Sequence, residues 1–403
     1  MRTVTLLALL LAGCAPSPRP GAAPAVRWWR GNTHTHTLWS DGDGAPESVV
    51  AWYKEHGYDF LVLSDHNSVL TGERWATVGT KWGQLPRAHL DALLAQYGSR
   101  VVTREREGTV EMLLRPLDDV RREFEEKGRF LMVAGEEISD VIGPAKTPLH
   151  HNALNTPRLI QPPGGATVRE AMERTVRLVE EEQQRCGCPV LVHLNHPNYA
   201  WAVTAEDLAH VVGERFFEVY NGHQLVHNEG DATRPGSERI WDLALTLRLT
   251  EIGGPLLYGL ATDDAHEHHK FPAVANPGRG WIVVRAPALT AEALLAAMRA
   301  GDFYASSGVA LEDVSHDAAG LSVRVAPKPG DTYTIRFLGT RKGAKEIGEL
   351  LREVEGTSAR YDFRGDELYV RATVISSRLH PNPYAAGDRE TAWVQPVPVR
   401  GRE

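Results

Sequence analysis

The sequence predicts an α/β protein in which a barrel or sheet of parallel strands is followed by a small antiparallel β domain. From about residue 27, short apolar runs alternate with helical patterns, as in folds built from parallel strands and crossover helices. Several runs are apolar almost throughout, which is typical of strands buried on both faces. After about Gly308 the pattern changes to short alternating strands separated by Gly, Pro and Asp. We therefore expect a first domain over 27–308 and a β domain over 309–403.

The expected elements follow from these periodicities. The apolar runs that predict strands in the first domain are Gly31–Thr37, Phe60–Ser64, Phe130–Ala134, His151–Asn155, Val190–Leu194, Phe216–Tyr220, Leu256–Ala261 and Gly280–Val284. The helical patterns are Pro46–Glu55, Pro86–Gln96, Leu117–Lys127, Val168–Gln184, Pro235–Arg248 and Ala291–Ala300. In the β domain we expect strands at Leu321–Ala326, Tyr333–Leu338 and Leu368–Val374. Residues 70–129 exceed a simple crossover, and we interpret them as an insertion that can cover the barrel mouth as a lid.

The first thirteen residues have the pattern of a targeting segment. A short apolar stretch follows Arg2, and it is too short to span a bilayer as a permanent helix. Leu11-Ala12-Gly13-Cys14 resembles the lipobox of bacterial lipoproteins, which implies that residues 1–13 are removed and Cys14 is lipidated. Residues 14–26 would then be a tether, and Ala15 after the cysteine favours the periplasmic face of the outer membrane. The alternative is a plain secretory signal.

Composition limits the partners. The net charge of −8 disfavours nucleic acid and anionic lipid, so we expect no nucleic-acid partner and membrane attachment only through the N-terminal lipid. The three cysteines, at positions 14, 186 and 188, imply no disulfide framework. Cys186 and Cys188 are expected to be too close for an unstrained bridge, and we interpret them as small residues before a buried strand.

Histidines and carboxylates gather where the predicted strands end. His34 and His36 alternate on one strand and so share a face, while Asp65-His66 and Glu136-Glu137 directly follow two apolar runs. His193, His196, Asp263, Asp264 and His266 follow two further runs, and His150-His151 opens another. The carboxyl ends of parallel barrel strands meet on one face, where active sites lie. Because burying so many ionisable groups without a metal is costly, the pattern predicts a metal site.

The same residues resemble the motifs of the polymerase and histidinol phosphatase (PHP) superfamily. The matching motifs, in family order, are Thr33-His34-Thr35-His36 with Ser40-Asp41-Gly42, Leu63-Ser64-Asp65-His66-Asn67, Gly135-Glu136-Glu137-Ile138, Asn195-His196-Pro197-Asn198 and Asp264-Ala265-His266. This resemblance implies a distorted (β/α)7 barrel with up to three metal ions. The stretch 301–308, Gly-Asp-Phe-Tyr-Ala-Ser-Ser-Gly, is similar to a branch that includes carbaryl hydrolases.

The resemblance also implies a ligand set. The first metal would be held by His34, His36, Glu137 and Asp264, the second by Glu137, His151 and His196, and the third by Asp41, His66 and His266. Neighbouring residues compete for several of these places. His151 is chosen over His150 because it continues into Asn-Ala-Leu-Asn, and His196 is chosen over His193 for its His-Pro pattern. Adjacent strand residues face opposite ways, so one of Glu136 and Glu137, and one of Asp263 and Asp264, should face the site.

We therefore expect a metal-dependent hydrolase with two or three divalent ions, of zinc, manganese or iron, that cleaves a small phosphoester with a metal-bound hydroxide. Asp65 is expected to orient His66 or another ligand, and Arg279 to bind substrate phosphate or lie in a solvated loop. Asn221 can line the pocket or make a turn. Hydrolysis of a carboxylic ester or carbamate on the same metals is the alternative. A non-catalytic metal-binding envelope lipoprotein is a third hypothesis.

Overall fold

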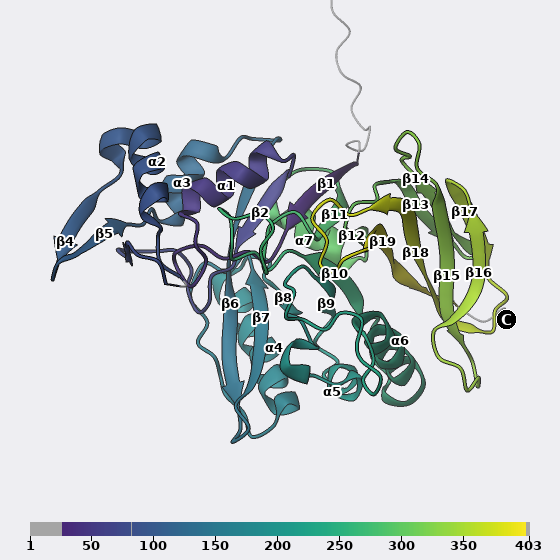
Figure 1. Cartoon of the computed structure of the whole chain (residues 1–403). Coiled ribbons are helices and arrows are strands. Elements are labelled where there is room, and N and C mark those ends of the chain that lie inside the picture. The colour runs from purple at the N-terminus through teal and green to yellow at the C-terminus, as the bar shows by residue number, and fades with distance from the viewer. Residues whose placement is uncertain (1–25, 82, 400–403) are drawn as a thin grey trace, which may run out of the picture.

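A mixed sheet of 13 strands runs through the molecule, in the order β10-β9-β8-β7-β6-β2-β1-β11-β12-β19-β18-β15-β16 (Figure 1). The computed structural model describes residues 26–81 and 83–399, so the predicted signal segment and Cys14 lie outside the described residues. The strands of this sheet that precede the predicted boundary at residue 308 are β1 (Arg27–Asn32), β2 (Phe60–Leu63), β6 (Leu131–Ile142), β7 (Thr147–Leu154), β8 (Leu191–Leu194), β9 (Phe216–Asn221), β10 (Tyr258–Thr262), β11 (Trp281–Ala286) and β12 (Phe303–Ser306).

Parallel pairing holds in only part of this sheet. β1, β2 and β6 are parallel, as are β8, β9 and β10, but β7 runs antiparallel to both β6 and β8. The reason is local, because β6 and β7 are joined by a tight turn in which Gly143 and Lys146 have φ angles of 64° and 52°. A turn of this length cannot hold the crossover that parallel strands require. The expectation of parallel strands is therefore wrong at β7, and also at β11, which pairs antiparallel with β1.

The segments that follow β1 and β10 lie side by side, although these strands are six places apart in the sheet order. An isolated parallel bridge pairs Thr35 with Ala265. The His36 amide donates to the Ala265 carbonyl at 2.8 Å, and the Asp264 amide donates to the His34 carbonyl at 3.0 Å. These bonds hold the backbone of two histidine-bearing motifs together.

Most α-helices of the described residues lie close to the predicted positions, but the helix at Ala205–His210 was not predicted. The α-helices are α1 (Pro46–Glu55), α2 (Arg87–Tyr97), α3 (Leu117–Phe124), α4 (Val168–Cys186), α5 (Ala205–His210), α6 (Ser237–Leu247) and α7 (Ala291–Arg299). Thr167 caps α4, since its side chain accepts a hydrogen bond from the Glu170 amide. Met172, Leu208 and Trp241, from α4, α5 and α6, are fully buried in one apolar core with residues of β7–β10. This core fixes the strands whose ends carry the histidines.

Cys186 and Cys188 form a disulfide, which corrects the expectation that they are unpaired small residues. The bridge is possible because Gly187, with φ 64°, ends α4 in the left-handed region and turns the chain back. The two Cα atoms are 5.2 Å apart, within the usual range for a disulfide.

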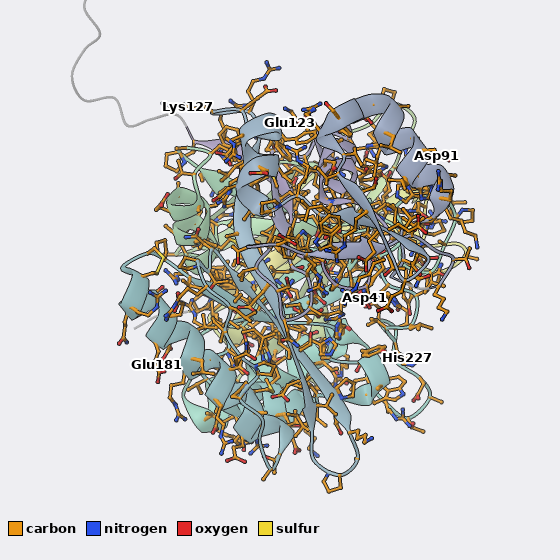
Figure 2. All side chains as sticks on the ribbon, turned by 90° about the vertical axis from the view of Figure 1, so that its left-hand side faces the viewer. Asp41, Asp91, Glu123, Lys127, Glu181 and His227 are labelled. Carbon is orange, nitrogen blue, oxygen red and sulfur yellow. A yellow bond between two sulfur atoms is a disulfide. The ribbon has the colours of Figure 1, made fainter. Side chains whose placement is uncertain are left out.

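The insertion at 70–129 has its own small sheet beside its two helices. Strands β3 (Trp75–Thr77), β5 (Thr109–Leu113) and β4 (Thr103–Arg106) pair in that order, and the sequence did not predict them. The insertion extends away from the large sheet in Figure 1. In Figure 2, Asp91 and Glu123 mark the insertion, and Asp41 lies between it and the region of His227. Its role as a lid stays a prediction.

The C-terminal strands are antiparallel, as predicted. They are β13 (Leu311–Asp317), β14 (Gly320–Val325), β15 (Tyr333–Arg341), β16 (Glu349–Glu355), β17 (Ser358–Asp362), β18 (Glu367–Leu379) and β19 (Arg389–Pro398). β13, β14 and β17 form a separate sheet, whereas β19 pairs with β12 and continues the large sheet across the boundary predicted at residue 308. Among the described residues, no helix combines the length and apolarity that a membrane crossing requires.

Candidate metal centre

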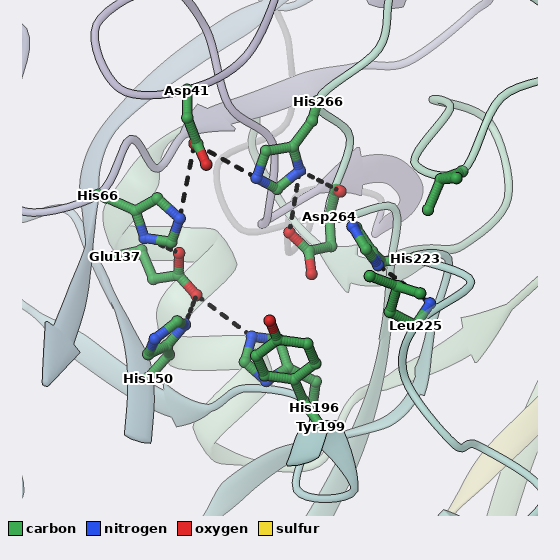
Figure 3. A pocket seen from close by; sticks show the side chains of 11 residues that line it. Asp41, His66, Glu137, His150, His196, Tyr199, His223, Leu225, Asp264 and His266 are labelled. Carbon is green, nitrogen blue, oxygen red and sulfur yellow. Dashed lines mark hydrogen bonds and ion pairs between the residues drawn. The ribbon is translucent and has the colours of Figure 1, made fainter. Parts of the chain in front are cut away.

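The predicted histidine and carboxylate motifs meet at one cavity of about 400 Å³ (Figure 3). They arrive on the segments after β1, β2, β8 and β10 and on β6 and β7. The residues that line the cavity are Asp41, His66, Glu137, His150, His196, Tyr199, His223, Leu225, Asp264, His266 and Val274. His34 and His36 lie beneath them and are fully buried. No residue of the insertion is among those lining residues.

Glu137 and Asp264 are the shared acceptors at the base of the site. The His34 Nε2 atom lies 3.2 Å from both Glu137 Oε1 and Asp264 Oδ1. The His36 Nε2 atom lies 3.2 Å from Asp264 Oδ1 and 3.4 Å from Glu137 Oε2. Two imidazoles thus point at the same two carboxylates, which is the four-residue group expected for the first metal.

The second group forms around the other side of Glu137. The His150 Nδ1 atom is 3.1 Å from Glu137 Oε1, and the His196 Nε2 atom is 3.5 Å from the same oxygen. His151 was expected here and lies elsewhere, with its Nε2 atom 3.3 Å from Glu214 on the opposite face of the sheet. The cause is strand alternation, because His150 and His151 are adjacent on β7 and only one can face the cavity. The structure therefore replaces His151 by His150.

Asp41, His66 and His266 form the third group. Asp41 Oδ1 lies 3.6 Å from His66 Nε2 and 3.4 Å from His266 Nε2. The His36 ring stacks on His266 with 4.0 Å between ring centroids, and His66 lies 2.6 Å from Glu137 Oε2 through Nδ1. The third group is thus in direct contact with the first through His36 and Glu137.

The donor atoms fit divalent cations. Four overlapping sets of three or four residues have ligand atoms within 4.8 Å of one another. They are His36, Asp41, His66 and His266; His34, His36 and Glu137; His34, His196 and Asp264; and His66, Glu137 and His150. Among the described residues, His34 Nε2, His36 Nε2 and Glu137 Oε2 are buried and make no hydrogen bond. Buried polar atoms left unpaired are costly, and imidazole with carboxylate suits zinc, manganese or iron.

Buried carboxylates behind the cluster orient its histidines. The His34 Nδ1 atom lies 2.7 Å from Glu218 Oε1, so a proton on Nδ1 leaves the Nε2 lone pair facing the cavity. The Asn221 amide bridges the second Glu218 oxygen, at 2.8 Å, to Asp264 Oδ2, at 3.1 Å. Asn221 thus supports the ligands rather than lining the cavity, and Glu218 was not predicted. A glutamate inside the apolar run Phe216–Tyr220 was the signal in the sequence.

Asp65 orients His36 rather than its neighbour His66. The Ser40 hydroxyl donates a hydrogen bond to Asp65 at 2.7 Å, and the Ser40 oxygen lies 3.3 Å from His36 Nδ1, from which it can accept a hydrogen bond. Thr37 adds its amide and hydroxyl to Asp65 at 2.8 and 2.9 Å. Asp65 is fully buried, so it acts as a support for a ligand and does not reach a substrate.

Arg279 is not available to a substrate, which corrects the expectation that it binds phosphate or lies in a solvated loop. It is fully buried, and its guanidinium donates to the carbonyls of Gly222, Ala273 and Val274 at 2.6–2.8 Å. It also contacts the side chain of Asn382, from the C-terminal part, at 3.2 Å. The interactions of Arg279 are those of a structural tie between loops.

Glu136 and Asp263, the neighbours of Glu137 and Asp264 in the sequence, face away from the cavity. Glu136 accepts a hydrogen bond from the Ile160 amide, and burial raises the pKa of its carboxyl to about 8. Asp263 accepts the amides of Arg279 and Gly280 at 2.6 and 2.8 Å. By contrast, burial would raise the pKa values of Glu137 and Asp264, but the surrounding histidines hold them well below their usual range. The structure thus places Glu137 and Asp264 in the cluster as anions.

Two members of the cluster have unusual backbone angles. His196 and Asp264 have φ values of 25° and 49°, in the left-handed region that favours glycine. Residues held there cost about 1–3 kcal/mol each and gather at functional sites. The surrounding fold keeps both side chains aimed into the cavity at that cost.

No family model and no curated protein matches the chain. A two-domain protein from Bacteroides vulgatus that contains a predicted PHP-like metal-dependent phosphoesterase is similar in structure, with 16% identity, 92% of this chain and 96% of that chain covered, and a TM-score of 0.42. A protein from Bifidobacterium adolescentis, assigned as a metal-dependent phosphoesterase, has 13% identity, covers 61% of this chain and 92% of its own, and has a TM-score of 0.31. Both likenesses are distant.

Proposed function

We propose that this protein is a metal-dependent hydrolase of the PHP type, built on a distorted seven-stranded barrel, that cleaves a small phosphoester at two or three divalent metal ions. The observation that carries the proposal is the convergence of nine imidazole and carboxylate side chains, Glu137 and Asp264 among them, with three buried ligand atoms left without hydrogen bonds among the described residues. Two observations support the barrel. Seven strands, from β10 to β1, are neighbours in one sheet, and the Thr35–Ala265 bridge joins the segment after β1 to the segment after β10.

The residues assigned to the metals follow the three groups of the cluster. The proposed ligands are His34, His36, Glu137 and Asp264; Glu137, His150 and His196; and Asp41, His66 and His266. When bound, such metals lower the pKa of water and polarise the bond to be cleaved. Glu137 is the one residue that contributes to two of these groups, so it sets the distance between them.

Buried side chains of the chain orient the proposed metal ligands from below the cavity. Glu218 and the Asp65–Ser40 pair hold Nδ1 of His34 and His36, so that both rings present Nε2 to the cavity. Asn195 donates to Glu137 Oε1 at 2.7 Å and fixes that carboxylate. Most of these supports are buried beneath the cavity, which Tyr199, His223 and Leu225 line on its other sides.

A carboxylic ester or carbamate is the second candidate substrate on the same site. The observation in its favour is charge, because no Lys or Arg is among the described residues that line the cavity. Enzymes that bind phosphate commonly add such cations to the metals. A phosphoester would therefore have to be held by the metals and by neutral donors.

The test loads the full chain with Mn²⁺ or Zn²⁺ and measures metal content and hydrolysis together. p-Nitrophenyl phosphate and bis(p-nitrophenyl) phosphate are compared with naphthyl acetate and a naphthyl carbamate. We expect at least two metals per chain and turnover of the phosphate substrates above the metal-free baseline. Turnover of the acetate or carbamate alone would select the second candidate. A metal-loaded protein that cleaves none of the four would contradict the proposed function.

We further propose that the chain is exported and anchored by a lipid on Cys14 at the periplasmic face of the outer membrane. The lipobox-like sequence supports this, and so does the Cys186–Cys188 disulfide, because disulfides persist in oxidising compartments. In a bacterial host, Cys14→Ala should release the protein from the membrane fraction, whereas a retained membrane signal would contradict the anchor.

A further inference from the structure

One wall of the cavity contains no metal-ligand candidate. It is formed by His223 and Leu225, on the loop after β9, and by Val274, on the loop before β11. Figure 3 shows His223 and Leu225 together on the side opposite His66 and Glu137. Leu225 is 58% exposed and Val274 38% exposed, so two apolar side chains face solvent at the mouth of a polar site. Such exposure at a cavity rim is typical of surface that a ligand covers.

His223 offers this wall one hydrogen-bond donor. Its Nδ1 atom accepts the Leu225 amide at 3.2 Å, so the proton of the neutral ring lies on Nε2. Its backbone amide in turn donates to Asn221 Oδ1 at 2.8 Å, which fixes the residue to the support of the cluster. The ring lies 5.6 Å from that of His266 between centroids, so the donor is next to a proposed metal ligand.

The described residues of this wall include no cationic side chain that could bind an anionic group on the alcohol part of the ester. Its side chains are one imidazole and two aliphatic groups, and the described lining residues include no Lys or Arg. Tyr199, across the mouth, packs against His196 at 5.2 Å between ring centroids and adds a flat aromatic surface. An uncharged aromatic or branched alkyl group suits these surfaces, whereas an additional carboxylate or phosphate would find no cationic side chain among the described lining residues.

The C-terminal part of the chain holds this wall in place. Arg279 donates to the carbonyls of Gly222 and Val274, so a single buried guanidinium joins the two loops that carry the wall. The Tyr384 hydroxyl donates to the Val226 carbonyl, and the Gln224 amide donates to the Tyr384 carbonyl at 2.9 Å. The loop between β18 and β19 thus braces the cavity wall from the outside.

We propose that His223, Leu225 and Val274 form the subsite for the alcohol portion of the ester, that this portion carries an uncharged aromatic or branched alkyl group, and that its alcohol oxygen accepts a hydrogen bond from His223 Nε2. The inference rests on the proposed hydrolase function. Hydrolysis breaks the bond between the acid group and the alcohol oxygen, and water supplies a hydroxyl to the first and a proton to the second. Arg279 and Tyr384 are positioning residues that act through the wall.

The experiment uses the metal-loaded full chain and matched phenyl and 4-carboxyphenyl esters of whichever acid the wild type cleaves. We expect the wild type to prefer the phenyl ester, in kcat/KM, by roughly tenfold or more, and Leu225→Arg to reduce or reverse that ratio. Leu225→Ala should raise KM for the phenyl ester by about tenfold. Leu350→Ala, on the distant strand β16 and 52% exposed, is the matched control and should change neither constant.

His223 is tested separately by a pair of substitutions. His223→Ala should lower kcat/KM for the phenyl ester, and His223→Gln, which keeps a side-chain donor, should restore part of it at unchanged metal content. If Leu225→Arg leaves the phenyl to 4-carboxyphenyl ratio unchanged in an active enzyme, the subsite assignment is wrong while the hydrolase function stands. If the wild type cleaves no ester of any of the three acid classes, the proposed function itself fails, and the subsite with it.

Discussion

Two buried clusters of charge in this protein behave in opposite ways. At the interface of α6 and β18, the Arg371 guanidinium donates to both oxygens of Asp242, at 2.8 and 2.7 Å, and to Glu238 at 3.0 Å. Tyr369 donates a further bond to Asp242 at 2.7 Å, so donors and acceptors match. At the candidate metal centre, imidazoles meet carboxylates but His34 Nε2 and His36 Nε2 still lack hydrogen bonds among the described residues. A satisfied cluster holds the fold together, whereas a cluster of imidazoles and carboxylates with buried ligand atoms free of hydrogen bonds is suited to bind a cation.

The largest effect should come from the residue that the metal groups share. Glu137→Gln removes the anion that approaches His34, His36 and His150, so we expect a loss of metal and a fall in hydrolysis on the order of a thousandfold, or about 4 kcal/mol of transition-state stabilisation. Metal analysis and steady-state rates measure both effects.

The adjacent glutamate is the matched control for that substitution. Burial raises the pKa of Glu136 to about 8, so its carboxyl is largely protonated at neutral pH and resembles the amide of glutamine. Glu136→Gln should therefore keep both metal and activity. Equal losses of metal and activity in Glu136→Gln and Glu137→Gln would contradict the assignment of Glu137 alone to the cluster.

The structural cluster should respond in stability instead of activity. Arg371→Met leaves the Asp242 carboxylate buried without its ion partner, which typically costs about 3–5 kcal/mol of unfolding free energy. Urea unfolding measures this loss, while metal content at low temperature should stay at the wild-type level. Asp242→Leu added to Arg371→Met should recover part of the stability, because neither charge then remains buried alone.

The sequence predicted the location of the metal centre better than its detailed contacts. The strand-end histidines and carboxylates, together with the resemblance to the PHP motifs, predicted eight of the nine cluster positions proposed here. His151 was wrong because one residue of strand register decides which face a side chain takes. Arg279 was wrong because only the folded chain shows that distant carbonyls surround it. The antiparallel β7 was also missed, although the turn at Gly143 was visible in the sequence.

Removing the metals should destabilise the protein by an intermediate amount. A ligand that binds only the folded state adds about 2.7 kcal/mol at a hundred times its Kd, so a chelator should lower the melting temperature measurably. Calorimetric melting with and without excess chelator gives the difference. An unchanged melting temperature after verified metal loss would contradict the idea that the cluster depends on cations.

Metal binding should also release protons, and the direction of the pH dependence of metal affinity follows from His66. Burial by itself would lower the pKa of this imidazole, but Glu137 and Asp41 raise it to about 9 in the metal-free protein. His66 is then protonated at neutral pH and must lose a proton to bind a metal, so apparent affinity should rise as pH increases toward 9. Titration calorimetry in HEPES and in Tris should give different enthalpies, and equal enthalpies would contradict the release.

The smallest effect in this series separates orientation from ligation. Ser40→Ala removes the hydroxyl between Asp65 and His36, so His36 loses the acceptor for its Nδ1 proton but keeps its place in the site. Loss of such a supporting bond typically lowers metal affinity by about 10–100-fold. Competition with a chelator of known affinity measures the change, and Ser99→Ala, on the exposed surface of the insertion, is the control. Because the defect lies in affinity, excess metal should restore activity in Ser40→Ala but not in Glu137→Gln. If excess metal fails to rescue Ser40→Ala, the hydroxyl does more than orient His36.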